Sequence, residues 1–333
     1  MKQITGKTYI NWYEGMLLWR KFEDKLAAAY IQQKIRGFLH LYNGQEAILA
    51  GCLHAIEIGK DRMISSYRSH VHSIGLGEDP KYVMAELYGK ATGTSGGLGG
   101  SMHIFSKKHN FFGGHGIVGG QIPLGTGISF GDKYFKRDNV TLCFMGEGAV
   151  RQGSFHESIN LAALWKLPVI YIIENNGYAM GTSVSRSTTQ IELWKQGDSY
   201  GIHSLSVDGM NIVKVAESID KCISHARKGN GPSLVEAKTY RYRGHSMSDA
   251  QQYRTKEEVE EYRKIDPISQ VKNTILKNKY ATEAKLKKID DKVKKKIKEC
   301  EEFAESSPFP DISLLYDSVY EQKDYPFIKH KID

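Results

Sequence analysis

The stretch VTLCFMGEG (140–148) and the stretch PVIYIIENN (168–176) decide the fold of this chain. Each begins with a short apolar run rich in β-formers, as strands buried on both faces of a parallel sheet do. Between them, residues 155–165 carry apolar side chains at near-helical spacing. A strand–helix–strand unit of this kind places Glu147 and Asn176 side by side at the carboxyl ends of two parallel strands. Open α/β sheets bind ligands at that edge.

The residue types at this edge predict a magnesium–diphosphate site. Glu147 supplies an anionic oxygen, Asn176 an amide oxygen, and the backbone carbonyl of Tyr178 a third. Three protein oxygens are too few for a calcium cage, but they suit Mg²⁺, which completes its shell with phosphate and water. Gly146 and Gly148 leave room for a diphosphate beside the backbone, and the N-terminus of the following helix attracts an anion. The alternative is an ordinary βα turn followed by an Asn-Asn-Gly turn.

These two halves resemble the thiamine-diphosphate/magnesium motif of thiamine enzymes, written GDG followed by NN. The longer run from Gly146 to Ser183 is similar to the alpha subunit of the decarboxylating first component of pyruvate dehydrogenase complexes. The resemblance covers the chain from about Ile10 to Pro310. It is carried by further motifs in the family order, namely GFLHLYNGQEA (37–47), SYRSH (66–70), GGSMH (99–103), GGHGIVGGQIPLG (113–125), VDGM (207–210) and YRYRGHSMSDAQQYRT (240–255).

One position departs from the family motif, because Glu147 stands where the family usually has aspartate. A carboxylate that is one methylene longer still binds magnesium if the strand end retreats slightly. Branched-chain relatives carry glutamate there, so the change bears on the substrate more than on the cofactor. The SYRSH and ALWKLP segments and the single histidine of RGHSMSD are pyruvate-type. A branched-chain 2-oxoacid or acetoin dehydrogenase alpha subunit is the alternative enzyme, and a non-catalytic α/β binding or assembly protein is the alternative from another class.

The resemblance also implies roles for individual residues. Arg68 forks its donors onto the diphosphate, although a surface salt bridge is the alternative. His40 and His245 are the expected catalytic residues, and His245 helps the acyl group pass to lipoate. Gly116 and Val118 are expected to hold the aminopyrimidine. The implied cofactor-binding set is His40, Tyr67, Arg68, Ser106, Gly116, Val118, Glu147, Gly148, Ala149, Asn176 and His245, and the implied metal ligands are Glu147, Asn176 and Tyr178.

The activity implied by the resemblance is oxidative decarboxylation of pyruvate with thiamine diphosphate and Mg²⁺ as cofactors. The acetyl group then passes to the lipoyl domain of a dihydrolipoamide acyltransferase core. In this family the glutamate that faces the pyrimidine ring lies on a beta subunit, and this sequence shows no second, pyrimidine-binding domain. We therefore expect the chain to be inactive alone and to form a heterotetramer of two alpha and two beta subunits.

Composition excludes several other classes of function. The chain has 333 residues, of which 40% are hydrophobic, enough for one large core or two small ones. No apolar run approaches the about 20 residues that cross a membrane, and the N-terminus has neither a signal core nor transit character. We expect a cytoplasmic protein or a processed organellar one. The four cysteines lack metal or CxxC spacing, which favours reduced structural thiols.

The formal net charge of +8 owes much to lysines between residues 272 and 298. A solvated helix face explains them best, because a nucleic-acid interface needs a basic surface interleaved with aromatics or a known module. A field that steers an acidic carrier domain is the remaining hypothesis.

The alternation of strands and helices predicts a doubly wound, mostly parallel α/β sheet with a helical C-terminal extension. The expected segments are a helical region (1–60), a cofactor-binding α/β region (61–255) and a helical extension with a tail (256–333), together in one continuous domain. We expect helices at 13–34, 45–58, 81–88, 121–134, 155–165 and 212–227, strands at 63–66, 140–145, 168–173, 205–207 and 234–240, a glycine-dense loop at 93–120, and an irregular tail with Pro308, Pro310 and Pro326.

Overall fold

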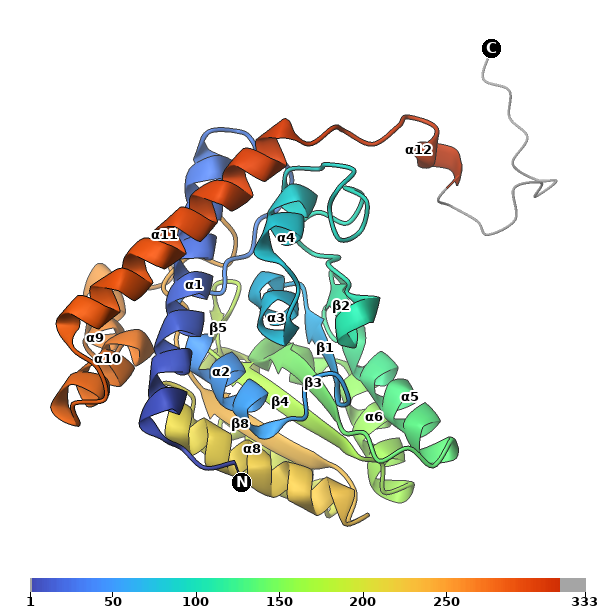
Figure 1. Ribbon diagram of the computed structural model, residues 1–333. Coiled ribbons are helices and arrows are strands. Elements are labelled where there is room, and N and C mark those ends of the chain that lie inside the picture. Colours follow the sequence, from blue (N-terminus) through green and yellow to red (C-terminus); the bar gives the residue numbers. More distant parts are fainter. Residues whose placement is uncertain (1, 318–333) are drawn as a thin grey trace.

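A computed structural model defines the structure of residues 2–317. Its centre is a six-stranded parallel sheet with the strand order β2-β1-β3-β4-β8-β7 (Figure 1). The strands are β1 (Arg62–Ser66), β2 (Phe111–His115), β3 (Thr141–Gly146), β4 (Val169–Asn175), β7 (His203–Asp208) and β8 (Ser233–Lys238). Since β2 lies on one side of β1 and β3 on the other, the strand order reverses at β1. Ligands of doubly wound sheets bind at such a switch point.

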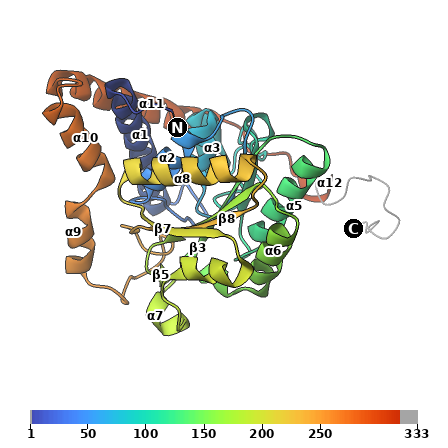
Figure 2. The ribbon, with the colours of Figure 1, turned by 90° about the horizontal axis from the view of Figure 1, so that it is seen from below.

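Helices cover both faces of the sheet (Figure 2). Leu142 and Ile172 point into the core under α1, α2 and α8, whereas Met145 and Tyr171 point into a second core under α5 and α6. The alternation follows from the period of two along a strand. The longer helices are α1 (Gly6–Ile31), α2 (Glu46–Ala55), α3 (His70–Leu76), α4 (Pro80–Leu87), α5 (Gln121–Tyr134), α6 (Gly153–Leu164), α8 (Ile212–Arg227), α9 (Lys256–Lys264), α10 (Pro267–Lys277) and α11 (Glu283–Ser306).

Shorter elements complete the chain. A two-stranded hairpin of β5 (Tyr178–Ala179) and β6 (Thr182–Ser183) follows the Asn-Asn pair. The remaining elements are the 3-10 helices η1 (Lys107–His109), η2 (Glu147–Arg151) and η3 (Leu193–Tyr200) and the short helices α7 (Val184–Ser187) and α12 (Leu314–Asp317).

Local sequence explains where the helices begin. Asn211 caps α8 by accepting hydrogen bonds from the backbone N–H groups of Val213 and Lys214. Asp79 caps α4, which begins with Pro80, a residue whose missing N–H costs nothing at that position. The predicted bounds of α5 and α8 are confirmed.

The glycine-dense segment 93–120 was wrongly predicted as loop throughout. Residues 111–115, with the sequence FFGGH, form the edge strand β2, paired in parallel with β1. Two of its five residues are glycines, which have low β-propensity, so the strand could not be predicted from propensity. Hydrogen bonding to β1 stabilises its extended conformation instead. Helix α1 also begins at Gly6, earlier than predicted, because Thr5 caps it.

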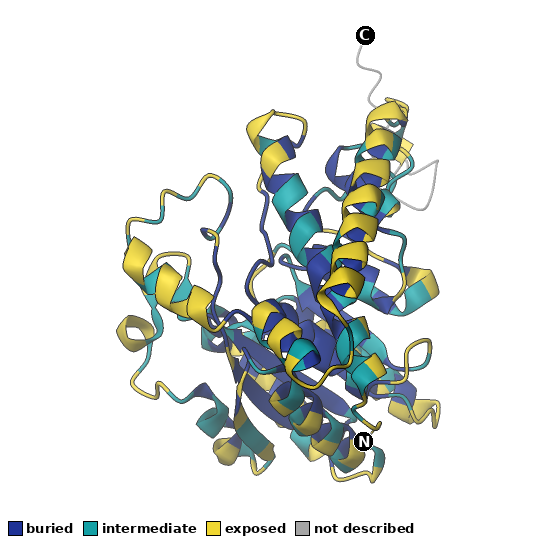
Figure 3. Ribbon diagram, turned by 60° about the vertical axis from the view of Figure 1, so that its left-hand side comes forward, coloured by how far each residue is buried: buried dark blue, intermediate teal, exposed yellow. Residues whose placement is uncertain are grey.

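Helix α11 packs one apolar stripe against α1 and α4. The opposite face carries lysines and is exposed (Figure 3), and Lys292 reaches Glu14 at 2.6 Å. The solvated face is therefore confirmed. The buried stripe consists of Leu286, Ile289, Val293, Ile297, Cys300 and Ala304.

One buried apolar cluster joins the three predicted segments, since it contains Phe22, Phe144 and Ile297. All four cysteines are buried and free. Among the helices of residues 2–317, none has the length and apolar character needed to cross a membrane. Pro308 and Pro310 lie in an irregular segment after α11, and Pro326 lies outside the described residues.

Candidate active site

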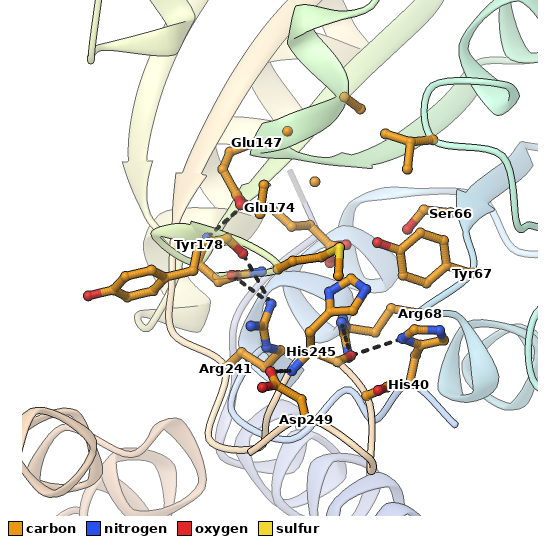
Figure 4. Close-up of a pocket in the computed structure, with 18 of the residues that line it drawn as sticks. His40, Ser66, Tyr67, Arg68, Glu147, Glu174, Tyr178, Arg241, His245 and Asp249 are labelled. Atoms are coloured by element: carbon orange, nitrogen blue, oxygen red, sulfur yellow. Dashed lines mark hydrogen bonds between the residues drawn. The ribbon is translucent and has the colours of Figure 1, made fainter. Parts of the chain in front are cut away.

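A cavity of about 720 Å³ opens at the carboxyl ends of β1, β3 and β4 (Figure 4). Parallel pairing sets Gly146 opposite Glu174, so the residues after β3 and β4 meet at one edge. Of the residues expected at the site, the cavity is lined by His40, Tyr67, Arg68, Gly116, Val118, Glu147, Gly148, Ala149, Asn176, Tyr178 and His245.

The three predicted metal ligands lie together, and two of them bind a positive charge. Nη1 of Arg241 donates to Asn176 Oδ1 at 3.1 Å and to the backbone oxygen of Tyr178 at 3.3 Å. The Glu147 carboxylate accepts the backbone N–H of Asn176 at 3.3 Å. All three side chains Glu147, Asn176 and Arg241 are buried. The guanidinium is thus the cation that the Asn176 and Tyr178 oxygens bind in this structure, and the Glu147 carboxylate lies next to Asn176.

Neighbouring groups orient this oxygen set and influence the pKa of its carboxylate. Gln45 Oε1 accepts from Asn176 Nδ2 at 3.0 Å, which turns the amide oxygen of Asn176 toward Arg241. Burial raises the pKa of Glu147, and the nearby Arg241 charge opposes that rise. Burial disfavours the ionised form of Glu147, so a metal cation beside it would stabilise the carboxylate.

The two glycines that flank Glu147 differ in their surroundings. A Cβ at Gly146 would meet open space, whereas a Cβ at Gly148 would lie 2.8 Å from the Cβ of Ala179. Gly146 therefore leaves room in the cavity, and Gly148 permits close packing of η2 on the β5–β6 hairpin. The predicted helix does not follow Glu147 directly, because η2 intervenes and α6 begins at Gly153.

Arg68 lies at the back of the cavity with both terminal nitrogens bonded. Nη1 donates to the Leu41 carbonyl at 2.7 Å and Nη2 to the His245 carbonyl at 2.8 Å. Burial, followed by the charge of Arg241, lowers the pKa of Arg68 to about 10. The positive charges of Arg68 and Arg241 repel each other in this cavity. An anion bound between them would relieve the repulsion, so the cavity favours an anion.

The rings of His40 and His245 lie against each other in the lining of the cavity, edge to face, with ring centroids 5.0 Å apart. Nδ1 of His40 lies 2.9 Å from the backbone oxygen of His245. Because a carbonyl only accepts, this nitrogen carries the proton and Nε2 is the acceptor. Burial and then Arg68 lower the pKa of His40 to about 3, and the same causes lower that of His245 to about 4. Both rings are neutral at pH 7.

The loop after β8 that carries His245 is tied together by its own side chains. Asp249 accepts the backbone N–H of His245 at 2.6 Å and the hydroxyl of Tyr253 at 2.8 Å. Tyr253 in turn accepts from Arg241 at 3.0 Å. The segment that carries His245 is therefore linked to the oxygen set through Arg241.

Ser106 is the one predicted cofactor residue that the structure places elsewhere. Its backbone pairs with Phe111 at the amino end of β2, whereas the cavity lies at the carboxyl ends of the strands. Its hydroxyl donates to Glu78 at 2.7 Å. The order of motifs along the chain does not show at which end of a strand a residue lies, so this prediction is corrected.

Sequence reasoning missed several residues of the cavity, among them Arg241, Gln45 and Glu174. Arg241 and Gln45 stand inside motifs quoted above, but their contacts to Asn176 need the tertiary structure. Glu174 precedes the Asn-Asn pair. It is buried, accepts the hydroxyl of Tyr42, and burial raises its pKa to about 7.

Comparison with known proteins agrees with this geometry. The family model described as "Dehydrogenase E1 component" matches residues 14–313. A protein of Rickettsia felis named "Pyruvate dehydrogenase E1 component subunit alpha" is 50% identical over 95% of this chain and 97% of its own length. A protein of Rhizobium meliloti with the same name is 50% identical over 92% of this chain and 88% of its own length. The chloroplastic subunit alpha-3 of Arabidopsis thaliana is 43% identical over 95% of this chain and 75% of its own length. The chain therefore belongs to the dehydrogenase E1 component family.

Proposed function

We propose that this chain is the alpha subunit of a pyruvate dehydrogenase E1 component. In this role it binds thiamine diphosphate and Mg²⁺, and takes part in the oxidative decarboxylation of pyruvate with acetyl transfer to a lipoyl group. One observation carries the proposal: the oxygens of Asn176 and Tyr178, with the Glu147 carboxylate beside them, accept hydrogen bonds from one cationic group at the switch edge of the sheet. The names of the similar proteins support pyruvate as substrate.

The residues present fit the cofactor. One carboxylate, one amide oxygen and one carbonyl oxygen form a partial shell of the kind that Mg²⁺ accepts together with phosphate and water. Glu147, Asn176 and Tyr178 would hold the metal, and Arg68 and Arg241 would neutralise the diphosphate. Gly116 and Val118, which also line the cavity, would contact the rings. When bound, thiamine diphosphate supplies the electron sink that decarboxylation of a 2-oxoacid requires.

The chain's own residues then bind, orient and exclude water. The neutral His40 ring, fixed through Nδ1–H to the His245 carbonyl, presents Nε2 as a proton acceptor or hydrogen-bond acceptor. Neutral His245 lies against the His40 ring and is suited to hold or pass a proton at the acyl group. Burial gives these groups a low local dielectric, which strengthens their interactions with a charged substrate.

A beta subunit is part of the proposal. The outer faces of α5 and α6 expose an aromatic patch, which we define as Phe130, Tyr134, Phe135, Leu164 and Trp165. Phe130 and Trp165 lie 5.2 Å apart between ring centroids, so the patch is continuous between the two helices. Val118 at the cavity is also 44% exposed. Exposed apolar groups in continuous patches mark protein interfaces, so this patch is the proposed contact surface of the beta subunit.

The lipoyl domain of an acyltransferase core is the proposed second partner, with the loop of His245 and Ser246 at its entry. A cytoplasmic location belongs to the same proposal, and cell fractionation would check it. A basic surface that steers the carrier is a separate hypothesis, which an association rate independent of salt would contradict.

Assembly and turnover test the function. The chain is co-expressed with the beta subunit, and pyruvate, 2-oxoisovalerate and acetoin are compared as substrates. We expect turnover of pyruvate by the assembled enzyme with added thiamine diphosphate and Mg²⁺, and none by this chain alone. Glu147, which branched-chain relatives share, favours a branched-chain 2-oxoacid enzyme as the second candidate, and preferential turnover of 2-oxoisovalerate would establish it. Decarboxylation by the purified alpha chain would contradict the need for a beta subunit.

A further inference from the structure

Three buried polar side chains form a hydrogen-bonded chain beneath the cavity. Nδ1 of His70, at the start of α3, lies 3.0 Å and 3.2 Å from the two carboxylate oxygens of Glu23 on α1. His70 Nε2 lies 2.7 Å from Ser101 Oγ. The exposed fractions of Glu23, His70 and Ser101 are 1%, 0% and 7%. The chain ends at the backbone of His40, whose N–H donates to Ser101 Oγ at 3.3 Å.

With one proton on the His70 ring, the donors and acceptors of this chain match in only one direction. Ser101 Oγ accepts the His40 N–H, so its own hydroxyl hydrogen is free to donate to His70 Nε2. His70 then carries its proton on Nδ1 and donates it to the Glu23 carboxylate. This assignment, made from the hydrogen-bond partners, satisfies every group in the chain.

The order carboxylate, imidazole and hydroxyl is also that of a nucleophilic triad. Ser101 does not line the cavity, however, although the adjacent Met102 does. Its hydroxyl oxygen is directed at a backbone amide rather than at the cavity. The arrangement is therefore suited to holding a backbone segment, not to attacking a substrate.

A second buried carboxylate holds the same glycine-dense loop. Glu86 of α4 accepts four backbone N–H groups, those of Ser95, Gly97, Gly99 and Gly100, at distances between 2.7 and 3.0 Å. Ser101 follows directly. The loop is thus fixed at its centre by Glu86 and at Ser101 by His70, which sets the position of Ser101 relative to His40.

Two further hydrogen bonds hold the backbone on either side of His40. Arg68 donates to the carbonyl of Leu41, and the backbone N–H of Met247 donates to the carbonyl of Leu39 at 3.0 Å. Both anchors hold oxygens of neighbouring residues, whereas Ser101 receives the His40 N–H itself. Its removal leaves that N–H unpaired in a buried place.

We propose that Glu23, His70 and Ser101 are positioning residues for His40, and that they act by fixing its backbone at the floor of the cavity. Two measurements test this proposal. The measurement of activity rests on the proposed function, and the measurement of amide hydrogen exchange does not. Displacement of an active-site group by about 1 Å can lower the rate about a hundredfold. Three residues outside the cavity therefore affect catalysis through the position of His40.

The first test is amide hydrogen exchange at His40 in the assembled enzyme. Ser101→Ala removes the acceptor, and we expect the His40 amide to exchange at least about tenfold faster, as the loss of one hydrogen bond of ordinary strength predicts. Ser95→Ala is the matched control, because it removes a hydroxyl of the same loop that bonds the His103 carbonyl. We expect His40 exchange in Ser95→Ala to equal that of the wild type.

The second test separates the two ends of the imidazole. An Asn amide replaces the Nδ1 position and a Gln amide replaces the Nε2 position. His70→Gln keeps a partner for Ser101, and His70→Asn keeps one for Glu23. Both remove the same buried ring, so a merely structural role predicts equal losses. We expect kcat/KM for the 2-oxoacid to fall about tenfold more in His70→Asn than in His70→Gln, mostly in kcat.

Equal His40 exchange in Ser101→Ala and wild type would overturn the proposal, as would equal kcat/KM in the two His70 variants. Labelling of Ser101 by a fluorophosphonate probe would also overturn it, in favour of a nucleophilic role. If the wild-type complex does not turn over any 2-oxoacid while His40 exchange responds to Ser101→Ala, the positioning role stands and the proposed function fails.

Discussion

Nη1 of Arg241 lies 3.1 Å from Oδ1 of Asn176. The same nitrogen lies 3.3 Å from the carbonyl oxygen of Tyr178, which is the third proposed metal ligand. A metal ion bound at the proposed site would compete with this guanidinium for the same oxygens. Binding of Mg²⁺ would then require Arg241 to leave them, and the diphosphate would offer it a new partner.

Arg241→Met should destabilise the cofactor-free chain by about 1–3 kcal/mol, because buried oxygens lose a charged donor. The loss should shrink when Mg²⁺ is present, since the metal serves the same oxygens. Urea unfolding with and without Mg²⁺ measures both values. The control is Arg243→Met, whose guanidinium is 44% exposed and pairs with Asp24 at 3.5 Å, and should cost about 0–1 kcal/mol. An equal loss for Arg241→Met in both conditions would contradict the competition.

Gly148→Ala and Gly146→Ala should have different effects, the first on the stability of the chain and the second on cofactor binding. A methyl at residue 148 collides with Ala179, so we expect a loss of about 1–3 kcal/mol in the cofactor-free chain. A methyl at residue 146 meets open space and should leave that stability within about 0.5 kcal/mol. It narrows the cavity, however, so it should weaken thiamine diphosphate binding. Urea unfolding and calorimetric titration of the assembled enzyme measure the two effects. Unchanged cofactor affinity in Gly146→Ala would count against the assigned cavity.

His72→Leu should change how stability depends on pH. His72 is fully buried against Tyr42, Phe111 and Phe144, and neither ring nitrogen has a hydrogen-bond partner within residues 2–317. Burial, with a smaller contribution from His70, lowers its pKa from 6.5 to about 3.

The sign follows from linkage. Below about pH 6.5 the unfolded chain binds a proton at residue 72, whereas the folded chain does not. The free energy of unfolding therefore falls as the pH drops toward 3. At pH 5 this amounts to about 2 kcal/mol. Urea unfolding at pH 7 and pH 5 should show His72→Leu gaining about that much relative to wild type between the two values. An equal difference at both pH values would show that the buried ring titrates normally.

Leu164→Asp should prevent assembly with the beta subunit. Leu164 is 70% exposed and belongs to the aromatic patch on α5 and α6, so a charge there opposes a buried interface. Ile31→Asp is the control, because Ile31 is 75% exposed at the far end of α1. Size-exclusion chromatography of co-expressed subunits should show a complex for Ile31→Asp and free alpha chain for Leu164→Asp. A stable complex with Leu164→Asp would place the interface elsewhere.

Much of the fold could be predicted because its central strands are apolar throughout. The run 140–145 and the run 168–173 have no polar face to misassign, and the predicted bounds of α5 and α8 match the structure. The edge strand β2 could not be predicted, since its five residues include two glycines and owe their conformation to pairing with β1.

The part of the candidate site that could be predicted consists of residues whose side-chain chemistry and place after a strand already indicate their role. Glu147 and Asn176 lie together as the sequence predicts. Arg241 and Gln45 were missed because their role depends on side chains from different elements meeting around Asn176. Ser106 was misplaced because a strand has two ends, and only the carboxyl end faces the cavity.

Binding of thiamine diphosphate to the assembled enzyme, titrated calorimetrically with and without Mg²⁺, tests the central claim most directly. Glu147→Gln keeps the size of the side chain and removes its charge. We expect wild-type binding to require Mg²⁺ and Glu147→Gln to weaken it about a hundredfold, as loss of about 3 kcal/mol from a charged ligand implies. Glu147→Asp, the residue more common in the family motif, should retain Mg²⁺-dependent binding. Wild-type affinity in Glu147→Gln, or binding indifferent to Mg²⁺, would contradict a metal held between the ends of β3 and β4.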